Sequence, residues 1–149
     1  MKERIIPLLL ATCLAVACSP AGRATPTPTP GPPLPHSMKG YELYSWPVDG
    51  QWHFALITGT NRTKTVDEIT TGEDQVTADG WVRIHVQGVA AIQAVLDRVP
   101  AGEWVFWVIR GWPLHVADAA GDITSPPQAI VDAVKEHAEL LGLRFQVDQ

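Results

Sequence analysis

The pattern of apolar and polar residues from Gly40 onward predicts a pair of strands first. Residues 41–46 and 52–57 alternate between apolar and polar side chains and are rich in aromatic residues, as half-buried strands are. The sequence Pro-Val-Asp-Gly from position 47, which lies between them, favours a tight turn, because Pro presets φ and Asp-Gly tolerates a left-handed conformation. We therefore predict an antiparallel β-hairpin.

A polar loop and a short helix are expected after the hairpin. The loop sequence GTNRTKT begins at Gly59, and Thr65 stands three residues before Glu68, which is the spacing of a capping box at a helix N-terminus. We expect that helix over residues 66–70. Residues 81–87 alternate again and predict a third strand, with Val82, Ile84 and Val86 on one face and Arg83, His85 and Gln87 on the other.

The C-terminal part of the chain alternates between helical and strand patterns. Apolar residues recur at helical spacing from 89 to 99 and from 126 to 141, and Ser125 with two following prolines predicts the second helix start, with Ser capping and Pro at the first helical position. Residues 104–109 are apolar without alternation, which is typical of a central strand covered on both faces. Residues 143–147 predict a last short strand. The expected buried stripe of the second helix is Ile130, Val134, Ala138 and Leu141.

The order of these elements predicts one α/β domain over residues 40–149. An antiparallel hairpin is followed by a βαβαβ succession, which suits a mixed sheet of about five strands with two main helices on right-handed crossovers. An α+β arrangement is the alternative. The pattern does not determine the order of the strands in the sheet.

The first 17 residues have the layout of an export signal. A short, weakly basic head is followed by 13 mostly apolar residues from Ile5 to Ala17, with small residues before Cys18. An apolar stretch of this length is too short to span a bilayer.

The sequence Leu-Ala-Val-Ala-Cys that ends at Cys18 resembles the lipobox of bacterial lipoproteins, although Ala15 stands where Leu is commonest. The resemblance implies cleavage of residues 1–17 before Cys18, after its thiol has been linked to diacylglycerol. It also implies an extracytoplasmic protein, a membrane-anchored lipoprotein of the cell envelope that carries fatty-acyl chains such as palmitate. The alternative is an ordinary cleaved signal that leaves an unpaired Cys18.

Residues 18–39 are predicted to be a lipidated cysteine followed by a Pro/Thr-rich tether. Seven of the twenty residues from 19 to 38 are prolines, and none is aromatic. Such a segment favours extended polyproline II and would hold the domain up to roughly 60 Å from the membrane. Its PxxP-like spacing also suits a ligand of a proline-binding domain.

Charge and cysteine content limit the classes of partner. The net charge is −5 and the chain has no run of Lys or Arg, so we expect no nucleic-acid partner. The two cysteines, Cys13 and Cys18, exclude a disulfide or a Cys-based metal site within the domain. The five histidines lack metal-binding spacing, and no nucleophile motif occurs. We expect no metal, no cofactor and no catalytic set.

The polar loop after the hairpin is the first candidate ligand site. Two cations that lead into a helix N-terminus can hold an anion. The alternative is architectural: the loop residues form the turn and helix cap, while Arg62 pairs with a carboxylate such as Glu42 or Glu68. The candidate ligand-binding residues are Asn61, Arg62, Lys64, Thr65 and Glu42.

Aromatic residues mark two further candidate surfaces. Arg110 and Trp112 follow the apolar strand at 104–109, at the end of the sheet where α/β proteins bind ligands, and could clamp a planar or anionic group. Alternatively, Trp112 covers the core. Trp46 and Trp52 flank the hairpin turn, and a glycan- or partner-stacking patch there is the alternative to packing in the core.

The stretch from Gly40 to Ile69, with the signature GYELYSW…GTNRxKTxxEI, resembles a group of small uncharacterised bacterial lipoproteins and exported proteins. The resemblance implies no activity, because none is known for the group. It marks a shared set of residues: Glu42, Trp46, Asn61, Arg62, Lys64 and Thr65.

These observations favour a lipid-anchored, non-enzymatic domain that binds an envelope protein or a small anionic ligand. The alternative is a small hydrolase or transferase that uses Arg62, Lys64 and a nearby carboxylate on an anionic envelope substrate.

Overall fold

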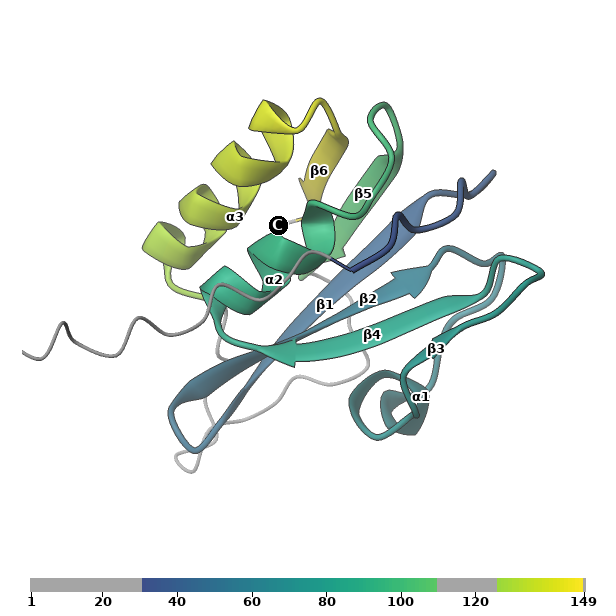
Figure 1. Ribbon diagram of the computed structural model, residues 1–149. Helices are drawn as coiled ribbons and strands as arrows, with labels where there is room; N and C mark the ends of the chain where they lie inside the picture. The colour runs from purple at the N-terminus through teal and green to yellow at the C-terminus, as the bar shows by residue number, and fades with distance from the viewer. Residues whose placement is uncertain (1–30, 110–125, 149) are drawn as a thin grey trace, which may run out of the picture.

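The computed structural model describes residues 31–109 and 126–148 (Figure 1). Cys18, Arg110, Trp112 and Ser125 therefore lie outside the described residues, and the predictions that rest on them stay predictions. The described elements follow one another in the chain as β1 (Tyr41–Val48), β2 (Gln51–Thr58), α1 (Val66–Thr70), β3 (Gln75–Val76), β4 (Val82–Gln87), α2 (Val89–Leu96), β5 (Trp104–Val108), α3 (Gln128–Leu140) and β6 (Arg144–Asp148).

The strands form one mixed six-stranded sheet in the order β3-β4-β2-β1-β5-β6. The prediction of an α/β domain, with a hairpin followed by β/α alternation and two main helices, is confirmed. The sixth strand is β3, which the sequence did not predict because two residues are too few to display a period. Helix α2 connects β4 to β5 across β2 and β1, whereas α3 connects the neighbouring parallel strands β5 and β6.

The hairpin is longer than its predicted strands. β1 and β2 pair from Tyr41↔Thr58 to Val48↔Gln51, so only Asp49 and Gly50 form the turn. Both have positive φ, 48° and 75°, as a two-residue type I′ turn requires. Pro47 lies within β1 rather than in the turn. A proline is tolerated there because β1 pairs with β5 only over residues 41–43, so no described strand lies where the missing N–H would donate.

The sheet buries its two faces unequally. Helices α2 and α3 lie over one face and cover the main core, while α1 lies on the opposite face and covers a smaller cluster (Figure 1). The sheet residues of the main core include Tyr41, Leu43, Phe54, Leu56, Val82, Ile84, Val105 and Trp107. The smaller cluster consists of Tyr44, Trp46, Ala55, Ile57 and Ile69.

The prediction that residues 104–109 form a strand covered on both faces is wrong for one face. Val105 and Trp107 are buried beneath the helices, but Trp104 remains 42% exposed and Phe106 is half-buried on the opposite face. The reason is the short length of α1, which packs through Ile69 against β1 and β2 and leaves β5 less covered. β5 is also not at the centre of the sheet, where β2 and β1 lie.

Helix α3 begins later than predicted. Pro127 is its N-cap residue and has no side-chain capping bond, so Gln128 rather than a proline is the first helical residue. The buried stripe contains Val131, which the sequence did not single out, together with the predicted Val134 and Ala138.

The end of the predicted tether packs on the domain. Leu34 is 3% exposed and belongs to the main core, and its N–H donates to the Arg98 carbonyl at 2.7 Å. The Arg98 Nε donates to the Pro32 carbonyl at 2.9 Å, and the Tyr41 hydroxyl donates to the Pro35 carbonyl. Residues 31–39 are therefore part of the folded unit, although we predicted them to be spacer.

Candidate functional site

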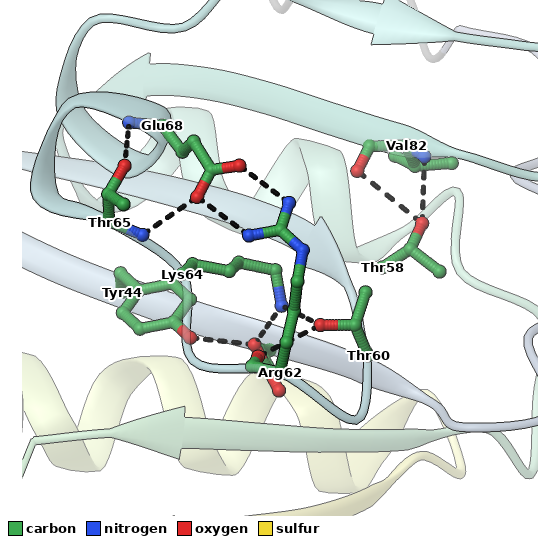
Figure 2. A network of polar contacts seen from close by, with 9 residues as sticks. Tyr44, Thr58, Thr60, Arg62, Lys64, Thr65, Glu68 and Val82 are labelled. Carbon is green, nitrogen blue, oxygen red and sulfur yellow. Dashed lines mark hydrogen bonds and ion pairs between the residues drawn. The ribbon is translucent and has the colours of Figure 1, made fainter.

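The GTNRTKT loop connects β2 to α1 and lies on the face of the sheet opposite α2 and α3 (Figures 1 and 2). Gly59 opens the loop, and its N–H donates to the Gly40 carbonyl at 2.8 Å. A Cβ atom at Gly59 would come within 2.5 Å of the Lys39 carbonyl oxygen, so the close approach of two backbone segments requires glycine. The loop is thereby fixed to the start of β1.

Arg62 is paired with Glu68. Its Nη1 and Nη2 atoms donate to the two carboxylate oxygens of Glu68 at 2.9 and 2.5 Å, so both terminal nitrogens are occupied in a bidentate pair (Figure 2). Glu68 also accepts the Thr65 N–H at 2.7 Å, while the Thr65 hydroxyl accepts the Glu68 N–H at 3.3 Å. This is the predicted capping box. The Arg62 guanidinium and then the Thr65 N–H lower the pKa of Glu68 to about 2.

Lys64 is 2% exposed. Its Nζ atom donates to the Glu42 carboxylate and lies 3.4 Å from the Thr60 hydroxyl oxygen. The Tyr44 hydroxyl donates to the same Glu42 oxygen at 2.6 Å. Burial, followed by the hydrogen bond to Glu42, raises the pKa of Tyr44 far above its ordinary value.

Both cations of the candidate ligand site are therefore engaged in ion pairs within the domain. Arg62 pairs with Glu68 and Lys64 pairs with Glu42, so the loop does not present them together to an anion. Thr65 caps α1, and Asn61 is exposed. Glu42 and Glu68 were the two carboxylates predicted as possible partners for Arg62. Glu68 is the partner of Arg62, and Glu42 is the partner of Lys64.

A pair of histidines that sequence reasoning missed lies on the same face, near the turn of the hairpin. The His53 Nδ1 and His85 Nε2 atoms are 2.9 Å apart, and the ring of Trp46 stacks on both imidazoles at centroid distances of 5.9 and 5.2 Å. Burial lowers the pKa of His85, with smaller contributions from His53 and Arg83. The pairing of β2 with β4 brings these histidines together. They are 32 positions apart in the sequence, so their spacing does not indicate that they are in contact.

Arg83 is a second missed residue. It is 4% exposed, and its guanidinium donates to the carbonyls of Glu68 and Ile69 at the end of α1 and to the Asp74 carboxylate, at distances of 2.9, 2.7 and 3.0 Å. A cation at a helix C-terminus is favourable because it satisfies free carbonyls there. The alternation of residues 81–87 predicted that Arg83 and Val82 lie on different faces of the sheet. It did not indicate that the charge of Arg83 would be buried.

Among residues 31–109 and 126–148, the large exposed aromatic side chain of this face is Trp104 on β5. Its ring lies parallel to that of Phe106, with centroids 5.4 Å apart, and the Arg144 guanidinium lies 5.6 Å from the Trp104 ring centroid. We call these three residues the aromatic surface. Trp46 is 5% exposed and Trp52 packs against the main core, so the alternative of a stacking patch beside the hairpin turn is not supported.

Known proteins give no further assignment. No protein-family model matches the chain, and searches of curated proteins and of solved structures found no match. Among residues 31–109 and 126–148, no helix has the length and apolar character that a membrane span requires. The same residues contain no cluster of three or more His, Cys, Asp or Glu side chains suited to a metal ion.

Proposed function

We propose that this chain is an extracytoplasmic lipoprotein, anchored to the membrane through Cys18, whose domain binds a ligand or an envelope partner. The anchor rests on the signal-like residues 1–17 and the lipobox-like sequence that ends at Cys18. The binding role is carried by one observation: the aromatic surface is exposed, while the two cations of the neighbouring loop are each neutralised by a carboxylate of the domain.

The aromatic surface suits a ligand with both apolar and polar faces, such as a saccharide of the envelope. The rings of Trp104 and Phe106 offer apolar area, and Arg144 lies beside them with hydrogen-bond donors. Gln146 and Asp148 follow on the same face of β6 and are exposed. Hydroxyl groups of a sugar would bind these side chains while its C–H face contacts the rings.

The rival proposal, a hydrolase or transferase for an anionic substrate, needs Arg62 and Lys64 to be available. Arg62 would have to leave a bidentate pair, and Lys64 would have to leave a buried one. Separating a buried pair costs about 3 kcal/mol or more, which a substrate would have to offset. The binding role requires no such rearrangement.

The anchor is tested by metabolic labelling with an alkyne analogue of a fatty acid. We expect the wild-type chain to be labelled and the Cys18→Ala chain to remain unlabelled. Cys13→Ala is the matched control, because Cys13 lies in the predicted signal, and it should be labelled like the wild type. Equal labelling of the Cys18→Ala chain would refute the anchor.

The binding role is tested by thermal-shift measurements on the full chain with envelope saccharides and small anions. A saccharide should raise the Tm of the wild type and of Val48→Ala, whose side chain is as exposed as that of Trp104, but not of Trp104→Ala. An anion whose effect is lost in Arg62→Ala and kept in Trp104→Ala would instead support the rival.

A further inference from the structure

The outer edge of β6 is unpaired over all five residues of the strand, as far as the structure describes the chain. β6 is the last strand in the sheet and pairs only with β5, whereas the opposite edge is formed by β3 with two residues. The Arg144 N–H donates to the Glu103 carbonyl and the Asp148 carbonyl accepts the Ile109 N–H, so residues 144, 146 and 148 direct their backbone groups toward β5. The N–H and C=O groups of Phe145 and Val147 therefore point outward.

Natural sheets block such an edge with charged side chains, above all lysine, or with proline, a bulge or a covering segment. β6 carries two charged residues, Arg144 and Asp148, but they have opposite signs, so they would not repel a second copy in antiparallel register. β6 has the sequence Arg-Phe-Gln-Val-Asp, which contains neither lysine nor proline. Its pairing with β5 is continuous from Trp104↔Arg144 to Val108↔Asp148, so no bulge interrupts it. The edge is regular, and none of the described strands pairs with it.

The order of side chains along β6 specifies which strand would fit. Arg144, Gln146 and Asp148 are exposed on the face that carries Trp104, while Phe145 and Val147 are half-buried on the helix face. An antiparallel copy of β6, related by a two-fold axis through Gln146, would bring each Arg144 opposite Asp148 of the second copy. Each Phe145 would lie opposite Val147 of the second copy, and the two Gln146 side chains would meet.

We propose that two copies of this chain associate through antiparallel pairing of their β6 strands, centred on Gln146. Phe145 and Val147 of each copy then exchange both backbone hydrogen bonds with Val147 and Phe145 of the other, which satisfies the outward groups. Opposite charges face one another at the two outer pairs and apolar residues at the two pairs inside them, with Gln146 opposite Gln146 at the centre. The contact is isologous, so it closes after two copies.

Charge complementarity determines the register. If the two-fold axis passed through Phe145 instead, Arg144 would face Gln146 of the second copy. If it passed through Val147, Asp148 would face Gln146. Only the register centred on Gln146 sets Arg144 against Asp148, and it does so twice. The joined sheet would carry the aromatic surfaces of both copies on one face, where they could bind neighbouring units of one polymer.

Disulfide formation tests this register. The experiment uses the full chain with Cys13→Ala and Cys18→Ala, so that one added cysteine is the only one. Residues at a pair without backbone hydrogen bonds have Cα atoms about 4.5 Å apart, within disulfide range, so Gln146→Cys should cross-link to its copy on oxidation. The matched control Arg144→Cys lies roughly 13 Å from its own copy and should not. Equal cross-linking of the two variants would overturn the proposal.

Charge exchange tests the contact independently. Sedimentation equilibrium should show a dimer for the wild type and roughly tenfold weaker association for Arg144→Asp and for Asp148→Arg, because like charges then face each other. The double variant Arg144→Asp/Asp148→Arg should recover the wild-type constant. Lys39→Asp changes an exposed cation just before β1, a strand that β5 separates from β6, and should leave the association constant unchanged. A wild type that stays monomeric at its highest soluble concentration, or a double variant without recovery, would overturn the proposal.

Discussion

The Nζ atom of Lys64 donates a hydrogen bond to the Glu42 carboxylate from a side chain that is almost completely buried, whereas the Glu42 side chain is 21% exposed. The pair is therefore asymmetric. Loss of the carboxylate leaves a buried ammonium that, among the described residues, keeps the Thr60 hydroxyl as its hydrogen-bond partner. Loss of the ammonium leaves a partly hydrated carboxylate that still accepts from Tyr44.

We expect Glu42→Gln to lower the free energy of unfolding by about 3 kcal/mol or more, and Lys64→Met to lower it by about 2 kcal/mol. The double variant should lose less than the sum of the two, because no unpaired charge remains buried. Urea denaturation of the full chain measures all three. A smaller loss for Glu42→Gln than for Lys64→Met would show that Lys64 is not buried as described.

The Arg62–Glu68 pair predicts a pH dependence in acid. The pKa of Glu68 is lowered from 4.5 to about 2, so the folded chain binds its proton less readily than the unfolded chain does. The stabilisation is present above pH 4.5 and is lost as the pH falls toward 2. Titration of the Glu68 carboxyl by NMR should give a low midpoint, and Arg62→Ala should move it back toward the ordinary value. The same midpoint in both chains would contradict the pair.

The histidine pair predicts a second pH dependence, nearer neutrality. Burial lowers the pKa of His85, and His53 and Arg83 lower it further, while Asp74 acts in the opposite direction. A histidine whose pKa is lower in the folded state stabilises the fold above its unfolded pKa of about 6.5, and that stabilisation is lost as the pH falls. The imidazole of His85 should therefore titrate below this value by NMR.

Substitution of His53 provides the comparison. His53→Gln removes one of the groups that lower the pKa of His85, so the midpoint of His85 should rise part of the way, since burial and Arg83 remain. His36→Gln, which contacts Glu103 instead, should leave the midpoint unchanged. A His85 midpoint that is insensitive to His53→Gln would mean that the two rings do not interact in solution.

Local patterns in the sequence predicted the helices and most strands of this fold. The order of the strands, and the contacts that follow from it, depend on pairing between distant residues. Asp49-Gly50 and the Thr65–Glu68 spacing are local signals, so the turn and the cap of α1 follow from the sequence. The position of β4 beside β2 depends on contacts between distant residues. No period along the chain encodes it, and the His53–His85 contact follows from it.

The two ion pairs of the candidate loop likewise comprise one local and one non-local contact. The sequence singled out Arg62 and Lys64 by their charge and offered Glu42 and Glu68 as partners. Arg62 pairs with Glu68, six positions away in the same loop and helix, which a local signal could indicate. Lys64 pairs with Glu42 across 22 positions, and its burial depends on how the loop lies over β1. The exposure of Trp104 likewise depends on how far α1 reaches over the sheet.

The packing of Leu34 predicts that the end of the proline-rich segment contributes to stability. Leu34 is 3% exposed within the main core, so Leu34→Ala should lower the free energy of unfolding by about 2–4 kcal/mol through lost burial and the cavity left behind. Leu140→Ala removes the same atoms from a side chain that is 81% exposed and should change stability by less than about 0.5 kcal/mol. Both are measured by urea denaturation. Equal effects would mean that residues 31–39 act as a free spacer, and a large loss for Leu34→Ala alone would show that the folded unit begins before Gly40.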